Sequence, residues 1–211
     1  MGNIWHDISP SRIHPEDFVC VIEIPKGSRK KYELDKETGL IQLDRILYTS
    51  THYPANYGFI PRTYGDDGDP LDVLLLCAET LEPLTLVRAY PVGVINMIDN
   101  GHNDEKIVAS PFNDPNYNMY KDISDLPRHL FDEMRHFFMV YKNLEDKATA
   151  VDEVSPRARA VKVMEEDGEF YLVDGFDSAM AYAFSMATYI PATLVKCEKP
   201  EGDFVRIKNS L

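Results

Sequence analysis

Cysteine is scarce in this sequence, and its cysteines are widely separated. The 211 residues include three, Cys20, Cys77 and Cys197, without a C-x-x-C pair. A disulfide framework or a redox pair needs more cysteines or a shorter spacing, so both are excluded. Cys20 and Cys77 also lie within apolar runs. We therefore expect reduced thiols in the core of a cytoplasmic protein.

Basic charge and long apolar segments are lacking as well. Lys and Arg total 22 against 35 Asp and Glu, which gives a formal net charge of -13. Such a surface repels the phosphate backbone of nucleic acids, so we expect no nucleic-acid partner. The longest apolar run, Val73 to Ala78, is far too short to span a bilayer, and residues 1–10 do not resemble a signal peptide. The sequence predicts a soluble chain without a membrane partner.

Short segments of β type are abundant. Hydrophobic residues make up 44% of the chain, enough for one core, and the composition nowhere shifts as it would between two domains. The β-branched and leucine-rich segments between turn residues predict strands at 18–25, 30–35, 40–48, 72–77, 84–90 and 92–98. A loop rich in Tyr, Pro and Gly is expected at 53–64. The first three strands predict a β-meander, and the whole set predicts a small closed barrel.

A helical period begins after the segment DISDLP. Ser124 or Asp125 would cap this helix, with Pro127 in its first turn. Apolar residues follow at steps of three or four, at Leu130, Met134, Phe137 or Phe138, and Tyr141. This spacing predicts an amphipathic helix.

Three further elements are expected toward the C-terminus. Residues 157–173 predict a hairpin around the turn EEDG, and residues 177–190 predict a second helix. The apolar segment at 203–207 predicts one more edge strand. No repeat separates these elements from the rest, so we expect a single domain over residues 1–211.

Four aspartates crowd the segment GDDGDPLDVLLL at residues 65–76. A solvated turn is one interpretation, because Asp, Gly and Pro are turn residues. However, two carboxylates about 4 Å apart repel by about 4 kcal/mol at an effective dielectric near 20, and a turn needs only one or two aspartates. In an extended segment Asp67 and Asp69 share a face, and Pro70 would let Asp72 approach them. Clustered carboxylates favour Mg²⁺ or a similar ion, whereas the EF-hand spacing for Ca²⁺ is not met.

A second acidic group lies at residues 99–106. Asp99 and Asp104 flank an Asn-Gly sequence, which by itself is equally consistent with a hairpin turn. Lys106 would share a strand face with Asp104, and carboxylates beside a cation are typical of a phosphate site. Glu23 supports such a site, because its charge inside the apolar strand VCVIEIP is unfavourable without a nearby cation. The histidines lack paired spacing, and we assign no metal to His52, His102, His129 or His136.

Several blocks of the sequence, taken in order, resemble the soluble family I inorganic pyrophosphatases. These blocks are VIEIP, KYELDKETG, YPANYGFIP, DGDPLDVLLL and HFFMVYKNLE, and they lie between Phe18 and Glu145. The D-G-D-P-x-D segment is the signature of that family. The resemblance implies a mainly β (α+β) fold, namely a five-stranded OB-like closed β-barrel with flanking α-helices and an additional C-terminal hairpin and helix. Residues 147–170 and 191–211 depart from the family pattern and are expected to be extensions.

The resemblance also implies an activity, which is the hydrolysis of pyrophosphate to two orthophosphates by a metal-activated water with several Mg²⁺ ions. It implies a homo-oligomer, either a hexamer or a dimer. Carried over residue by residue, it makes Asp69 the general base, with Tyr57 beside it. The metal ions would be held by Asp67, Asp72, Asp99, Asp104 and Glu23. Pyrophosphate would be bound by Lys31, Arg45, Lys106, Tyr141 and Lys142, in a pocket whose wall is supported by Glu33 and Tyr53.

Two other functions remain open at this point. A Mg²⁺-dependent phosphohydrolase that acts on nucleotides or other phosphate esters would use the same carboxylates, although no segment supplies an obvious pocket for a base. A barrel of OB type could instead bind nucleic acid. The acidic charge of the chain argues against that second alternative.

Overall fold

The protein is described here by a computed structural model, in whose described residues strands predominate and two α-helices accompany them. The mainly β fold expected from the sequence is thus confirmed. In the described part of the chain, no helix is both long and apolar enough to cross a membrane. The described residues are 4–5, 7–35, 37–65, 69–99, 102–145, 149–167, 170–173, 192–195 and 203–207.

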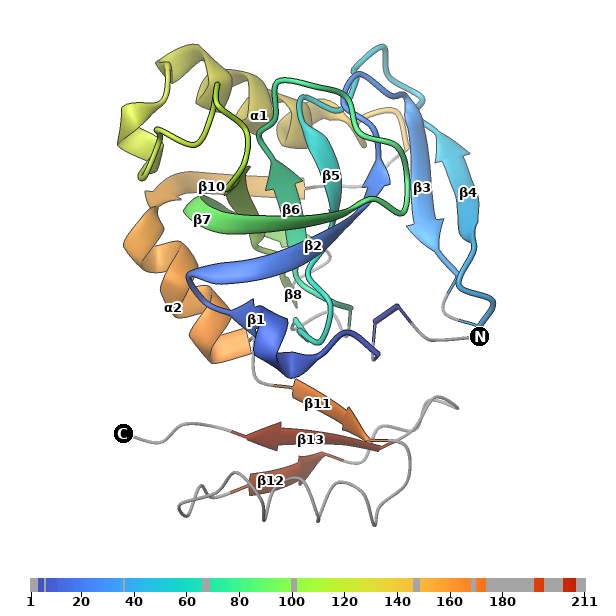
Figure 1. Ribbon diagram of the computed structural model, residues 1–211. Coiled ribbons are helices and arrows are strands. Elements are labelled where there is room, and N and C mark those ends of the chain that lie inside the picture. The colour runs from blue at the N-terminus through green and yellow to red at the C-terminus, as the bar shows by residue number, and fades with distance from the viewer. Residues whose placement is uncertain are drawn as a thin grey trace.

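Five strands are hydrogen-bonded to one another in a ring (Figure 1). In order around the ring, the strands are β2 (Asp17–Ile24), β5 (Asn56–Phe59), β6 (Asp72–Leu75), β9 (Lys106–Pro111) and β7 (Leu86–Asp99), and β7 pairs again with β2. All neighbours in the ring are antiparallel except β6 and β9, which run parallel. The ring therefore brings together segments that are far apart in the sequence.

Short elements extend this ring. The strand β1 (Ile13–His14), which follows the 3-10 turn η1 (Pro10–Arg12), pairs with β2. The strands β8 (His102–Asn103) and β10 (Thr149–Pro156) both pair with β7.

The expected β-meander at the start of the chain is only partly present. The strand β3 (Lys30–Leu34) pairs with β4 (Ile41–Ile46) in a separate two-stranded sheet, and β2 pairs instead with β1, β5 and β7. Among the described residues, neither β3 nor β4 pairs with a strand of the ring, so this hairpin lies outside the ring. Figure 1 shows this hairpin standing at one side of the ring.

The described C-terminal strands pair with one another. The strand β13 (Asp203–Ile207) lies between β11 (Phe170–Val173) and β12 (Ala192–Val195). The strand expected at 203–207 is therefore present, but it is the middle strand of its sheet and not an edge strand. The helix expected at 177–190 lies outside the described residues.

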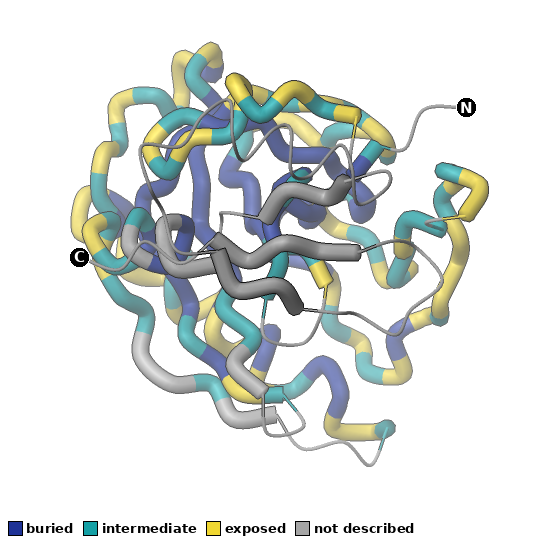
Figure 2. Tube along the Cα trace, turned by 90° about the horizontal axis from the view of Figure 1, so that it is seen from below, coloured by how far each residue is buried: buried dark blue, intermediate teal, exposed yellow. Residues whose placement is uncertain are grey.

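Both faces of the central strands are buried. Val73 and Leu75 of β6 pack in one apolar cluster, and Leu74, which points the opposite way, packs in another. The helix α1 (Arg128–Val140) contributes to the cluster that contains Leu74, and α2 (Arg157–Asp167) contributes to the other. Strands covered on both faces are apolar at most positions, which agrees with the burial of all six residues of β9, where Lys106 and Ser110 are the polar ones. Figure 2 shows the buried segments at the centre of the protein.

The amphipathic helix predicted after DISDLP is confirmed as α1, with Met134, Phe137 and Phe138 buried. The predicted cap is wrong. No side chain caps α1. Asp122 instead accepts from the Ser124 amide at the start of a separate 3-10 turn, η2 (Ile123–Asp125), and Asp125 accepts from the Asp122 amide. Pro127 stands just before Arg128, the first residue of α1, so the 3-10 turn η2 precedes the α-helix as a separate element.

The hairpin predicted at 157–173 is wrong, because residues 157–167 form the helix α2. The segment RARAVKVM alternates in polarity, which favours a strand, but it also places apolar residues at helical spacing. Ala160, Val163 and Met164 are all buried, and they lie on one helical face at steps of three and four. Burial of this face against the strands selects the helix.

Two strand boundaries also differ from the expectation. The predicted loop at 53–64 contains β5, whose four residues are all buried. The strands predicted at 84–90 and 92–98 are one continuous strand, β7. Pro91, which stands between the two predicted strands, lies within β7 at an irregularity where the register with β9 shifts between Pro91 and Gly93.

Gly58 allows β5 to approach β2 closely. A Cβ atom at this position would lie 1.8 Å from the carbonyl oxygen of Val21. We expect Gly58→Ala to lower the free energy of unfolding by about 3 kcal/mol or more, because backbone atoms of β2 must move. Urea denaturation measures this change.

Gly39→Ala is the matched control for this prediction. Gly39 has φ +71 but nothing within 4 Å of an added Cβ, so only backbone strain of about 1–2 kcal/mol is expected. Equal losses for the two variants would contradict the close approach of β5 and β2.

Candidate active site

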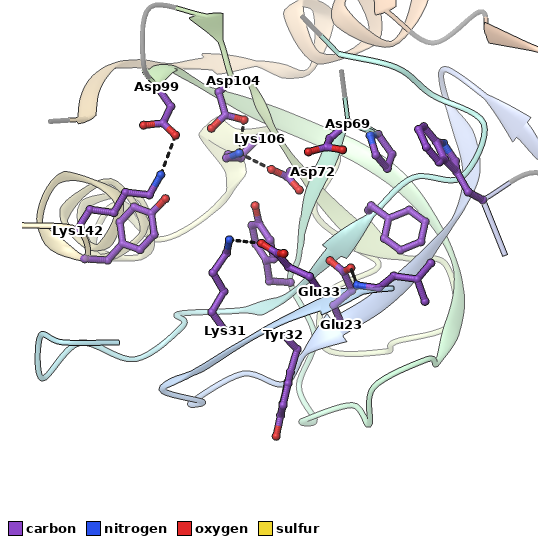
Figure 3. A pocket seen from close by; sticks show the side chains of 16 residues that line it. Glu23, Lys31, Tyr32, Glu33, Asp69, Asp72, Asp99, Asp104, Lys106 and Lys142 are labelled. Carbon is purple, nitrogen blue, oxygen red and sulfur yellow. Dashed lines mark hydrogen bonds and ion pairs between the residues drawn. The ribbon is translucent and has the colours of Figure 1, made fainter. Parts of the chain in front are cut away.

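A cavity of about 390 Å³ lies where the predicted functional residues meet (Figure 3). Its polar lining includes eleven of the fourteen predicted residues: Glu23, Lys31, Glu33, Tyr57, Asp69, Asp72, Asp99, Asp104, Lys106, Tyr141 and Lys142. Arg45 and Tyr53 do not line the cavity, and Asp67 lies outside the described residues. Sequence reasoning missed the apolar part of the wall, which consists mainly of Trp5, Tyr32, Leu34, Phe59 and Pro70.

Strand pairing places Lys106 among carboxylates. Asp72 is the first residue of β6, and its neighbours in register are Phe59 of β5 on one side and Lys106 of β9 on the other. The Lys106 ammonium donates to both Asp72 and Asp104, and its side chain is almost fully buried. Burial disfavours an ammonium ion, but the two carboxylates outweigh burial and raise the pKa of Lys106.

A second lysine is paired with the remaining aspartate of this group. Asp99 ends β7, and its Oδ2 atom accepts from the Nζ atom of Lys142, just beyond α1, at 2.7 Å. The other carboxylate oxygen, Oδ1, is buried and has no hydrogen-bond partner among the described residues. An unpaired buried carboxylate oxygen is unfavourable, which favours binding of a cation or a donor at this position.

The hairpin of β3 and β4 supplies the other cations. Lys31 pairs with Glu33 on its own strand and with Asp44 at 3.3 Å. The Nε atom of Arg45 donates to Glu145 at 3.0 Å. Sequence reasoning assigned no role to Asp44 or Glu145, although each stands within three residues of a predicted cation.

Glu23 differs from the other acidic residues in the cavity. It lies between the buried residues Ile22 and Ile24 of β2, and its Oε1 atom accepts from the Leu34 amide at 2.7 Å. Among the residues that the structure describes, it forms no ion pair. Burial raises the pKa of Glu23 to about 8, and the charge of Asp72 adds to this effect. Glu23 is therefore largely protonated at neutral pH in the absence of a bound cation.

Buried tyrosines form one wall of the site. Tyr53 stacks obliquely on Tyr57, with ring centroids 5.3 Å apart, and Tyr141 packs against Phe138 of α1. Burial raises the pKa of Tyr57 well above its usual value, and the charges of Asp72 and Asp104 raise it further. The Tyr57 hydroxyl therefore stays protonated and can act as a hydrogen-bond donor.

Asp69 lines the cavity, and Figure 3 shows it next to Asp72. The extended geometry expected for Asp67 and Asp69 involves residues 66–68, which lie outside the described residues. The Gly65 amide donates to the Asp69 carbonyl at 2.7 Å. Asp69 thus reaches the cavity from a loop, while Asp72 reaches it from the start of a strand.

The donor set of the cavity fits divalent cations. Six acidic side chains and three lysines line it, so the cavity has an excess of negative charge. Burial raises the pKa of Asp104, and Asp72 and Asp99 raise it too, although Lys106 opposes them. Within the described ranges, however, no three acidic, His or Cys side chains already stand close enough to hold a metal ion. The carboxylates are gathered in one place, but Asp72, Asp99 and Asp104 are each engaged with a lysine.

Comparisons with known proteins agree with this picture. A model of the inorganic pyrophosphatase family matches residues 20–172. Soluble inorganic pyrophosphatase 2 of Chlamydomonas reinhardtii is 48% identical over 167 residues, which are 79% of this chain and 87% of that protein. Soluble inorganic pyrophosphatase 4 of Arabidopsis thaliana is also 48% identical, over 79% of this chain and 77% of that protein.

Solved structures give the same result. The inorganic pyrophosphatase of Helicobacter pylori superposes with a TM-score of 0.72 at 40% identity, over 84% of this chain and 99% of that chain. The enzyme of Thermus thermophilus superposes with a TM-score of 0.70 at 36% identity, over 76% of this chain and 94% of that one. The family match includes residues 147–170 and ends before 191–211. Since both the family model and these relatives cover most of its length, the chain belongs to the inorganic pyrophosphatase family.

Proposed function

We propose that this protein hydrolyses inorganic pyrophosphate to two orthophosphates with the aid of Mg²⁺. The observation that carries the proposal is a cavity lined by both carboxylates and lysines, in a chain of this family. Pyrophosphate is a small and highly charged substrate that requires both kinds of group. Hydrolysis of nucleotides or other phosphate esters is not favoured by the comparisons and becomes an outcome of the test below.

The carboxylates would hold the metal ions. Mg²⁺ prefers oxygen donors, and it keeps some water and substrate oxygens in its shell. When bound, divalent ions supply Lewis acidity, which lowers the pKa of a coordinated water and offsets phosphate charge. The residues that we assign to these ions are Asp67, Asp72, Asp99, Asp104 and Glu23.

Asp69 would accept the proton of the attacking water. It is one of the acidic residues of the cavity, and the loop that carries it lies beside the start of β6. A carboxylate at hydrogen-bond distance from a water molecule can serve as a general base. Tyr57, whose hydroxyl stays protonated, would donate a hydrogen bond on the same side of the cavity.

The cations would bind the phosphate groups. Lys31, Lys106 and Lys142 line the cavity, and Tyr141 lies among them. Once Asp72 and Asp104 are neutralised by bound ions, the Lys106 ammonium is free to donate to phosphate oxygens, where charge increases in the transition state. Arg45 has a buried Nη2 atom without a partner among the described residues, which supports a role in binding an anion. Glu33 and Tyr53 would support the cavity wall.

The type of barrel and the assembly are two further assignments, and membership of the same family supports both. We propose that the ring of five strands is a barrel of OB type, which would place the cavity beside its strands. The proposed assembly is a homo-oligomer. The cytoplasmic location stays a prediction from the cysteine pattern.

We expect Asp69→Asn to lower kcat for pyrophosphate by about 10²- to 10⁴-fold, because the general base is lost. Phosphate release from pyrophosphate, ATP and p-nitrophenyl phosphate, with Mg²⁺ and with excess EDTA, measures the effect and the specificity. Asp132→Asn, at an exposed position on α1, is the matched control and should keep wild-type activity. Unchanged activity in Asp69→Asn, or faster release from ATP, would contradict the assignment.

Mg²⁺ should stabilise the folded protein through the aspartates. At 100 times its dissociation constant, a ligand adds about 2.7 kcal/mol, which corresponds to a rise in Tm of about 5–10 °C for a chain of this size. We expect Asp104→Asn to lose most of this rise, whereas Asp132→Asn keeps it. Calorimetry with and without Mg²⁺ tests this, and an unaltered rise in Asp104→Asn would remove Asp104 from the metal site.

The metal-free protein should lose stability as the pH rises. The pKa of Glu23 is raised to about 8 in the folded state from 4.5, so between these values the folded state holds a proton that the unfolded state has released. This stabilisation is complete below pH 4.5 and is lost as the pH rises toward 8. In EDTA, Glu23→Gln should flatten the pH dependence of the free energy of unfolding over this range. Glu133→Gln, on the exposed face of α1, should leave it unchanged.

A further inference from the structure

A threonine hydroxyl is inserted into the ladder between β5 and β6. Phe59 and Asp72 are the last paired residues of the two strands, so Ile60 and Leu71 form the next pair. The Ile60 amide donates directly to the Leu71 carbonyl at 2.9 Å. The reciprocal bond is relayed: the Leu71 amide donates to the Thr63 hydroxyl at 2.8 Å, and this hydroxyl donates to the Ile60 carbonyl at 2.6 Å. In an ordinary hydrogen-bonded pair of antiparallel strands, both bonds join the two backbones directly.

The relay fixes the point at which the two strands part. Thr63 is 1% exposed, so water cannot replace its hydroxyl without rearrangement. The Thr63 hydroxyl lies between the Leu71 amide and the Ile60 carbonyl. The backbone at Leu71 is therefore farther from β5 than it would be in a directly bonded pair. Asp72 follows Leu71 directly, and Asp69 lies two residues before it. The position of both aspartates in the cavity therefore depends on this opening.

The N-terminal segment braces the turn that carries Thr63. Trp5 is 3% exposed, and its indole Nε1 donates to the Thr63 carbonyl at 3.2 Å. Its own carbonyl accepts from the Arg62 amide at 3.1 Å. Arg62 has a positive φ of 62°, which is unfavourable for a residue other than glycine unless neighbouring contacts hold it. Trp5 also lines the cavity, so the brace reaches from the turn to the site itself.

We propose that Thr63 is a positioning residue for the aspartate loop, and that Trp5 assists it by holding the turn in place. This inference rests on the proposed function, since it concerns the geometry of that reaction. It also gives a function to the N-terminal segment, because Trp5 lies before residue 20, where the family match begins.

Thr63→Val and Thr63→Ser test the proposal as a pair. Valine keeps the shape of the side chain but removes the hydroxyl, so the Leu71 amide and the Ile60 carbonyl must either pair directly or stay unpaired. Either result moves the aspartates. We expect Thr63→Val to lower kcat for pyrophosphate by about 10- to 100-fold at saturating Mg²⁺, which is the effect of a displacement near 1 Å. Serine restores the relay, so Thr63→Ser should recover most of the activity.

A loss of overall stability alone must be distinguished from mispositioning. Val163→Ala removes buried methyl groups in α2, outside the cavity lining, and it should lower Tm while keeping kcat. The proposal is overturned if folded Thr63→Val matches the wild type, if serine fails to rescue it, or if Val163→Ala loses as much activity. A wild-type protein that releases no phosphate would instead overturn the proposed function.

Trp5 supplies a readout that does not depend on catalysis. It is the one tryptophan in the sequence, so intrinsic tryptophan emission reports on the cavity wall. Titration with MgCl₂ alone should give a weaker apparent affinity for Thr63→Val than for the wild type or Thr63→Ser. Equal affinities in all three proteins would show that the relay does not position the aspartates. Trp5→Phe should lower kcat in the same direction but less, and an unchanged kcat would remove Trp5 from the brace.

Discussion

The pairing of buried lysines with aspartates is the interaction on which the rest of this structure depends. Lys106 is almost fully buried, and it is tolerated there because Asp72 and Asp104 both accept from it. The aspartates are tolerated near one another for the same reason. Removing either kind of charge would leave the other uncompensated in a partly dry cavity. Even so, the lining contains twice as many acidic residues as lysines, and this excess of negative charge favours cations in the cavity.

The ring of strands turns distant residues into neighbours. Asp72 and Lys106 are 34 positions apart in the sequence, but parallel pairing of β6 with β9 sets them side by side. Asp99 and Lys142 meet because β7 and α1 end near the same point. The close approach of β5 to β2 at Gly58 completes the ring, so the geometry of the cavity depends on packing as well as on its own charges.

Much of this could be predicted from the sequence, and the failures have physical causes. Alternating and apolar segments predicted most strands of the ring, and the blocks shared with a known family predicted which side chains would meet. The segment RARAVKVM satisfies both a strand period and a helical period, and only the packing of Ala160, Val163 and Met164 decides between them. The role of Thr63 was not predictable either, because a relay through a hydroxyl depends on a pairing register that local sequence does not encode.

The ion pairs between lysines and aspartates stabilise the metal-free protein, but they also occupy the groups that are proposed to bind metal ions and phosphate. A carboxylate oxygen that accepts from a lysine is not open to a metal ion, and an ammonium held by aspartates is not open to phosphate, although the Oδ1 atom of Asp99 has no partner among the described residues. On the proposed assignment, Asp72 and Asp104 would hold a cation in place of the Lys106 ammonium, and Lys106 would then be available to the substrate. Metal binding and substrate binding would thus be coupled through the same few bonds. Each would raise the affinity for the other by the same factor, which corresponds to a negative coupling free energy. A cavity with fewer carboxylates would keep its lysines free, but it would have no charge excess with which to attract the ions.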